Sequence, residues 1–168
     1  MESELQRVVW RPPTHAVIAG RDVLVQLWET ASPTEGFRAV KAWCEERRQR
    51  EGDRPLYMMS VVGEGGPMPD GEARAIASEF PAYFTEFVMV VEGSGFRASA
   101  VRAVLAGMAL VAPRRTAPTV VTSVHEGCVA LARQSGGVVD ARRLEVAIDA
   151  ARRAIRGLPG AGLRAPTG

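Results

Sequence analysis

The sequence predicts an α/β domain in which an N-terminal β-hairpin precedes four strand–helix units that form a mostly parallel sheet with packed helices. Short apolar runs alternate with segments of helical periodicity, which is typical of parallel strands joined by crossover helices. The run at residues 56–62 is apolar almost throughout, as expected for a strand covered on both faces. Two Ser-x-x-Glu capping boxes, at residues 32–35 and 123–126, mark helix starts shortly after such runs.

The hairpin and the first helix open the domain. Residues 15–19 and 23–28 are expected to be antiparallel strands because the turn signal Gly20-Arg21-Asp22 separates them. The helix begins at the first capping box, and Gly52 stops it. We expect residues 45–51 to be its solvated end. Its inner stripe is Phe37, Val40 and Cys44.

The later units follow the same plan. The strand at 56–62 leads through a loop rich in Gly and Pro into a helix at 70–84, which Pro81 must kink or end. The inward positions of this helix are Ala73, Ile76, Ala77, Phe80 and Phe84. The strand at 87–91 precedes a helix that ends at Pro113. This helix buries Val101, Val104, Leu105, Met108 and Val111. The last strand, at 119–122, precedes a helix from Ser123 to about Arg133.

Length and patterning suggest one domain with a C-terminal appendage. A chain of 168 residues suits a single core, and we place the domain at residues 1–136 and the appendage at 137–168. The appendage is predicted to form a basic amphipathic helix at about 140–156, followed by a flexible tail. Its apolar stripe is Leu144, Ile148, Ala151 and Ile155. We expect the stripe to dock on the domain; the alternatives are a homodimer through this helix, a partner protein or an acidic membrane surface.

Composition excludes several classes of function. The net charge of +2 comes from the appendage, so the domain lacks the cationic surface that nucleic-acid binding needs. No signal peptide or transmembrane segment is apparent, and we expect a cytoplasmic protein with buried, reduced thiols at Cys44 and Cys128. The two histidines, His15 and His125, have no nucleophile or metal-ligand spacing around them. We therefore expect no enzyme activity, no metal and no cofactor.

Two stretches resemble a known family. They are Pro118-Thr119-Val120-Val121-Thr122-Ser123-Val124-His125-Glu126-Gly127-Cys128-Val129-Ala130-Leu131 and Ala100-Val101-Arg102-Ala103-Val104-Leu105. Together with the order of elements, they make residues 14–134 similar to the STAS domain, the fold of anti-sigma factor antagonists and related regulatory modules. The resemblance implies a protein partner, either an anti-sigma-type kinase or a component of a sensory assembly.

The same resemblance points to a position on the loop before residue 73. Phosphorylatable members carry Asp-Ser-Ser-Gly or Asp-Ser-Thr-Gly there, whereas this chain has Asp70-Gly71-Glu72-Ala73 and lacks the acceptor hydroxyl. The loop is expected to bind the partner without a phospho-switch, through Glu64, Met68, Asp70, Gly71 and Glu72. Ordinary capping of the helix is the favoured explanation of Asp70 and Glu72, and a sharper hypothesis is that Glu72 mimics a phosphate charge.

A second candidate site is a possible ligand-binding turn. Its sequence, Gly93-Ser94-Gly95-Phe96-Arg97-Ala98, fits the dinucleotide-binding pattern G-x-G-x-x-A between a strand and a helix. A small molecule or nucleotide would bind its anion on Gly93, Ser94, Gly95 and Arg97. The motif lies in a late unit and lacks the acidic residue expected about twenty positions further on. A tight turn capped by Ser94 accounts for the same residues.

Overall fold

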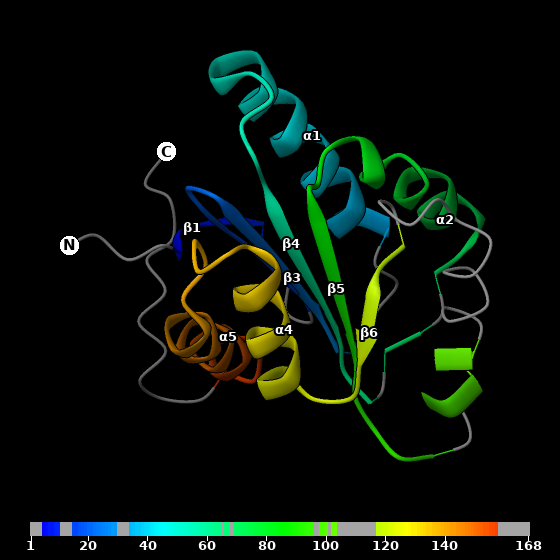
Figure 1. The fold of residues 1–168 in the computed structure, drawn as a ribbon. Coiled ribbons are helices and arrows are strands. Elements are labelled where there is room, and N and C mark those ends of the chain that lie inside the picture. Colours follow the sequence, from blue (N-terminus) through cyan, green and yellow to red (C-terminus); the bar gives the residue numbers. More distant parts are fainter. Residues whose placement is uncertain are drawn as a thin grey trace.

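The computed structural model describes residues 5–10, 15–29, 34–64, 66–67, 69–95, 98–100, 102–103 and 117–157. Figure 1 shows a twisted sheet between two layers of helices, with α1 and α2 on one face and α4 and α5 on the other. The strands are β1 (Leu5–Trp10), β2 (His15–Gly20), β3 (Val23–Trp28), β4 (Tyr57–Val62), β5 (Glu86–Val91) and β6 (Thr119–Val121). The helices are α1 (Thr34–Glu51), α2 (Gly71–Ala77), α4 (Val124–Gln134) and α5 (Ala141–Ile155), with a short 3₁₀ helix η1 at Phe80–Ala82.

The six strands lie side by side in chain order, and the sheet is mixed. β1, β2 and β3 pair antiparallel, whereas β3, β4, β5 and β6 pair parallel. The predicted α/β class, the hairpin and the parallel strands that follow it are therefore confirmed. The face of the sheet under α1 and α2 is called the α1 face below, and the opposite one the α4 face.

Three expectations about the elements are wrong. The sequence pattern missed β1, whose pairing with β2 has two register irregularities that break the alternation of a regular strand. The helix expected at 70–84 ends at Ala77, because Pro81 cannot continue an α-helix and the chain turns into η1 instead. Arg47 is only 4% exposed although it lies in the segment expected to be solvated.

Arg47 is buried because its guanidinium closes the amino-terminal end of the sheet. It donates to the carbonyls of Arg54 at 3.1 Å and of Arg21 and Pro55 at 3.3 Å each. These acceptors lie in the hairpin turn and in the segment before β4, so one side chain from α1 ties three segments together. The two terminal nitrogens of the guanidinium are satisfied in this way, while Nε makes no hydrogen bond and lies 3.5 Å from the carboxylate of Glu51.

Helix ends follow the sequence signals where they are described. Ser123 caps α4 in a reciprocal capping box with Glu126, and Asp140 caps α5 by accepting from the amide of Arg143 at 2.8 Å. Gly52 ends α1 with a left-handed φ of 69° and donates to the Arg48 carbonyl at 2.9 Å. Part of the first predicted capping box, Ser32 and Pro33, lies outside the described residues.

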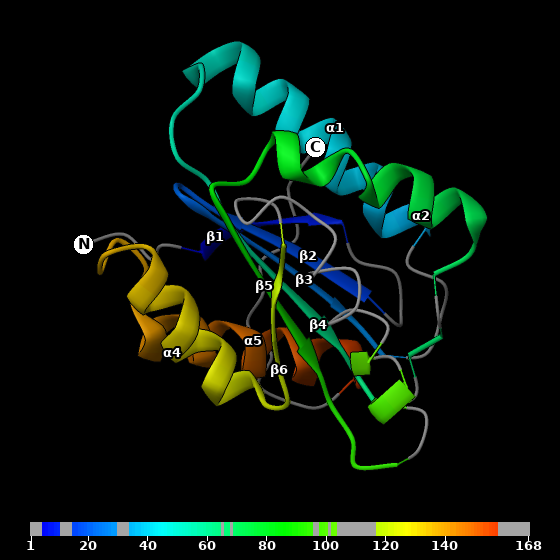
Figure 2. The same ribbon diagram turned by 45° about the vertical axis from the view of Figure 1, so that its right-hand side comes forward.

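The α4 face is closed by α4 and α5. α4 approaches the sheet closely at Gly127, and α5 packs against α4, β2 and β3. The apolar stripe of α5 is buried there, with Leu144 at 2% exposure and Ile148 and Ala151 at 0%. The predicted docking of this helix on the rest of the chain is therefore seen (Figure 2), and the stripe is not left open for another molecule.

Candidate functional site at the carboxyl edge of the sheet

The parallel strands bring the loop after β4 and the turn after β5 to one edge of the sheet. The ladder continues one residue past the strands: the amide of Gly63 donates to the Trp28 carbonyl at 2.9 Å, and that of Glu92 to the Val62 carbonyl at 3.0 Å. Ligand and partner sites of α/β proteins commonly form at the carboxyl ends of parallel strands. Both segments that the sequence singled out therefore start from this edge.

At the start of α2, Asp70 is held at both carboxylate oxygens. Its Oδ1 accepts from the amide of Ala73 at 2.8 Å, which is the N-cap bond, and its Oδ2 accepts from the Thr34 hydroxyl at 2.8 Å. Thr34 is the first residue of α1, so Asp70 fixes the start of α2 against the start of α1. Capping of the helix by Asp70 is confirmed.

Glu72 is exposed but paired. Its carboxylate accepts from Nε of Arg38 at 3.0 Å and from a second guanidinium nitrogen, and Arg38 also contacts Glu35 at 2.5 Å. The hydrogen bond and charge of Glu72, followed by the charge of Glu35, raise the pKa of Arg38 above its usual value. Arg38 therefore offsets the negative charge that the phosphate-mimic hypothesis assigns to Glu72. We call Arg38, Asp70, Gly71 and Glu72 the α2 corner.

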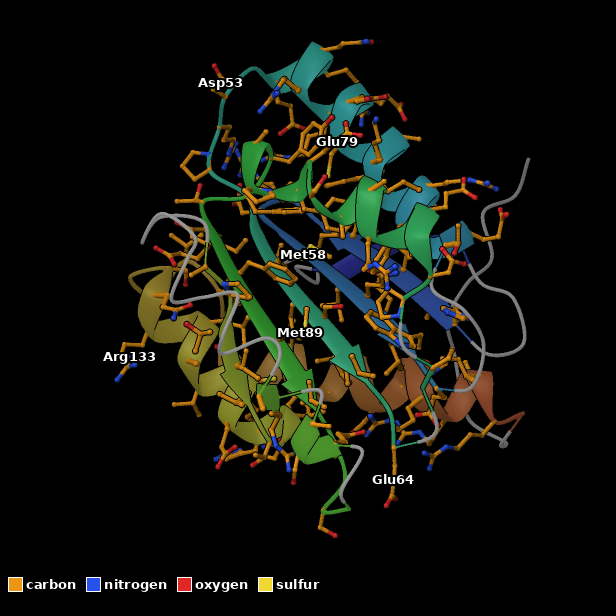
Figure 3. All side chains as sticks on the ribbon, turned by 90° about the vertical axis from the view of Figure 1, so that its right-hand side faces the viewer. Asp53, Met58, Glu64, Glu79, Met89 and Arg133 are labelled. Carbon is orange, nitrogen blue, oxygen red and sulfur yellow. The ribbon has the colours of Figure 1, made fainter. Side chains whose placement is uncertain are left out.

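Glu64 does not belong to the α2 corner. Figure 3 shows it projecting from the end of the molecule away from α2, and its side chain lies against Gly93. A Cβ at Gly93 would come within 3.0 Å of Cγ of Glu64. The structure therefore separates the five residues predicted for partner binding, and it brings one of them to the turn predicted for ligand binding. Met68 lies outside the described residues.

The turn after β5 is built around Gly93, whose left-handed φ of 98° disfavours other residues. Arg102 donates to the carbonyls of Val91 at 3.1 Å and Gly93 at 3.0 Å, which fixes the turn. Ser94 and Gly95 are exposed, and Arg97 lies outside the described residues. The carboxylate of Glu64 occupies the space beside Gly93, and it would repel a phosphate there.

Four further charged residues gather at the same edge, and the sequence reasoning missed them as a group. Arg152 on α5 donates through Nε to Glu29 at 2.9 Å and through a terminal nitrogen to Glu92 at 2.6 Å. Arg156, one helical turn later, reaches Glu29 at 3.0 Å. The two glutamates follow β3 and β5 directly, so the end of α5 is fastened across the strand ends. The sequence shows that Arg152 and Arg156 lie four residues apart on one helix, but it does not show that they pair with Glu29 and Glu92.

Three of the remaining reactive side chains, Cys44, Cys128 and His15, are buried. Burial raises the pKa of Cys44 and of Cys128 to about 12 and lowers the pKa of His15 to about 4. Within the described ranges, no three His, Cys, Asp or Glu side chains are arranged to hold a metal ion. No helix in that part of the chain is long and apolar enough to cross a membrane.

Comparisons of the chain with protein-family models, with curated proteins and with solved structures give no match.

Proposed function

We propose that this chain is a non-enzymatic regulatory or adaptor protein with a STAS-like fold, and that it binds a protein partner through the α2 corner. The observation that supports this most strongly is a rigid yet exposed surface. Asp70 is fixed by Thr34 and Ala73, while Gly71 and Glu72 beside it are exposed. A surface that is ordered before binding loses less conformational entropy when the partner arrives.

The ion pair of the α2 corner can be replaced by an ion pair with a partner protein. The Arg38–Glu72 ion pair is half exposed, at 50% and 54%, and exposed pairs contribute little to stability. A basic side chain of the partner can therefore displace Arg38 from Glu72 at small cost to the fold. Such complementary charges set the register and the association rate more than the affinity.

The family resemblance supplies the partner classes. Residues 70–73 stand where phosphorylatable STAS domains carry the acceptor, and neither Gly71 nor Glu72 has a hydroxyl. We therefore propose binding without a phospho-switch at this position. The partner is either an anti-sigma-type kinase or a component of a sensory assembly.

The alternative function is a small-molecule or nucleotide binder at the Gly93 turn. The left-handed Gly93 and the exposure of Ser94 and Gly95 favour it. The carboxylate of Glu64 beside Gly93 disfavours a phosphate, so we rank this function second.

Cross-linking in the native cell tests the first proposal. A photoreactive amino acid is placed at Gly71, at Gly95 and at Arg153, an exposed position on α5. We expect one protein to be cross-linked from position 71 and not from the other two. Equal cross-linking from all three positions would contradict the proposal.

Two glycines provide matched blocking variants. A Cβ at Gly71 meets only a terminal nitrogen of Arg74 at 4.0 Å, and a Cβ at Gly95 meets nothing within 4 Å. Gly71→Trp and Gly95→Trp should therefore both fold while each covers one candidate site. We expect Gly71→Trp to lose the partner and Gly95→Trp to keep it. The reverse result would contradict partner binding through the α2 corner and would place the partner at the Gly93 turn.

A further inference from the structure

The centre of the α1 face contains buried polar side chains that have no hydrogen-bond partner in the part of the chain that the structure describes. Gln26 on β3 and Ser60 on β4 are register neighbours, at 0% and 1% exposure. Neither the amide nitrogen and oxygen of Gln26 nor the hydroxyl of Ser60 has a hydrogen-bond partner among the described residues. The buried indole nitrogen of Trp28, two residues along β3, also lacks one. Buried groups of this kind need an explanation, because unmade hydrogen bonds are costly.

The same row of residues opens toward β5 and β6. Ser60 pairs in register with Met89, and Met89 with Val120, and both of these side chains are partly exposed. Phe87, on the same face of β5, is partly exposed as well. In contrast, Val88 and Val90 on the α4 face are 0% exposed. The row therefore runs from a closed polar end to a partly open apolar end, where Met89 is labelled in Figure 3.

This gradient is the usual chemistry of a small-molecule site, in which an apolar wall carries a few polar groups at its deep end. The hydrophobic cluster on this face includes Leu24, Met58 and Val91, and an unpaired carboxylate or phosphate is costly to bury in apolar surroundings. The Gln26 amide offers a donor beside an acceptor, and Ser60 offers either. The complementary head group is neutral and has the same pair, as in a carboxamide or a lactam.

We propose that the α1 face of β3, β4 and β5 binds a neutral amphiphile, with a carboxamide-type head on Gln26 and Ser60 and an apolar body along Met89. Met89 is suited to the open end because its thioether side chain is flexible and adapts to a bound molecule. The site is separate from the α2 corner, and the inference does not depend on the proposed partner.

A thermal-shift titration of the full chain with octanamide tests the site. A ligand at 100 times its Kd should raise Tm by about 5 to 10 °C in a chain of this size. We expect the shift to disappear in Ser60→Ala and Gln26→Leu, and to persist in Ser94→Ala, whose serine is exposed. Octanoate, which would place an unpaired charge on the same groups, should give no shift.

Two further measurements guard against variants that misfold. Met89→Trp fills the open end beside Ser60 while it leaves both polar side chains in the sequence, and it should also abolish the octanamide shift. In the wild-type protein, octanamide should move the indole N–H resonance of Trp28, assigned with Trp28→Phe. A wild-type Tm that octanamide leaves unchanged, or a shift that survives in Ser60→Ala, would overturn the proposal. So would a crystal grown with octanamide that shows only water on Gln26 and Ser60.

Discussion

Gly127→Ala reverses the usual effect of replacing a glycine inside a helix. Helix propensity alone predicts that alanine stabilises α4 by about 1 kcal/mol. In the structure, however, a Cβ at Gly127 would lie 2.6 Å from Cγ2 of Val90 and 3.3 Å from Cε of Met59. Overpacking costs about 1–3 kcal/mol, and the 2.6 Å approach to Val90 places Gly127→Ala in the upper part of this range, at about 2–3 kcal/mol. After subtraction of the propensity gain, we expect a net destabilisation of about 1–2 kcal/mol. Urea denaturation followed by circular dichroism measures it, with a Tm lower by about 2–8 °C as a second readout.

A double-mutant cycle identifies the contact. Val90→Ala removes the methyl group that a new Cβ would strike, so Gly127→Ala should cost less in the Val90→Ala background, by about 1 kcal/mol or more. Gly71→Ala is the matched control, because its Cβ would meet only a terminal nitrogen of Arg74 at 4.0 Å, and it should change stability by less than about 0.5 kcal/mol. A Gly127→Ala protein as stable as wild type, or additive effects in the cycle, would show that α4 does not approach β5 as described.

Three other predictions follow from charges and burial. Arg152→Met should lower the free energy of unfolding by about 1.5–3 kcal/mol in urea denaturation, because two carboxylates at the strand ends lose the partner that they share. Arg153→Met, at an exposed position, should leave the free energy of unfolding almost unchanged. Equal losses in the two variants would contradict the role of Arg152. Burial lowers the pKa of His15 to about 4, so the unfolded chain binds more protons between pH 4 and 6.5. Stability should fall by about 3 kcal/mol as pH drops through this window, and less in His15→Gln, as measured by unfolding at several pH values. Burial raises the pKa of Cys44 and Cys128 to about 12, so a thiol reagent should modify them at pH 7.5 only in denaturant; rapid labelling of the native protein would refute this.

Local signals in the sequence predicted most of the secondary structure. The capping bond of Asp70 and the capping box at Ser123 were readable because their partners lie three residues away. The strand at 56–62 was recognised by its continuous apolar pattern, and it pairs with a strand on both sides. β1 was missed because its register irregularities remove the period of two on which recognition depends.

The sequence predicted only part of the candidate site. The sequence placed Asp70, Gly71 and Glu72 at a helix start, and they are there. It did not show that Arg38, which lies 34 residues before Glu72, neutralises that carboxylate. It also grouped Glu64 with these residues, although the chain carries Glu64 to the turn at Gly93.

The sequence by itself determined most of the segments that become strands and helices, β1 excepted, because hydrophobic periods and caps act over a few residues. Only the tertiary structure decided which charges meet, since those pairs depend on strand order and on the path of α5. Arg152 lies 123 residues from Glu29 along the chain, and their 2.9 Å contact exists only because α5 returns across the carboxyl ends of the strands. Burial of Gln26 beside Ser60 follows in the same way from strand register, which pairs two residues that no local pattern connects.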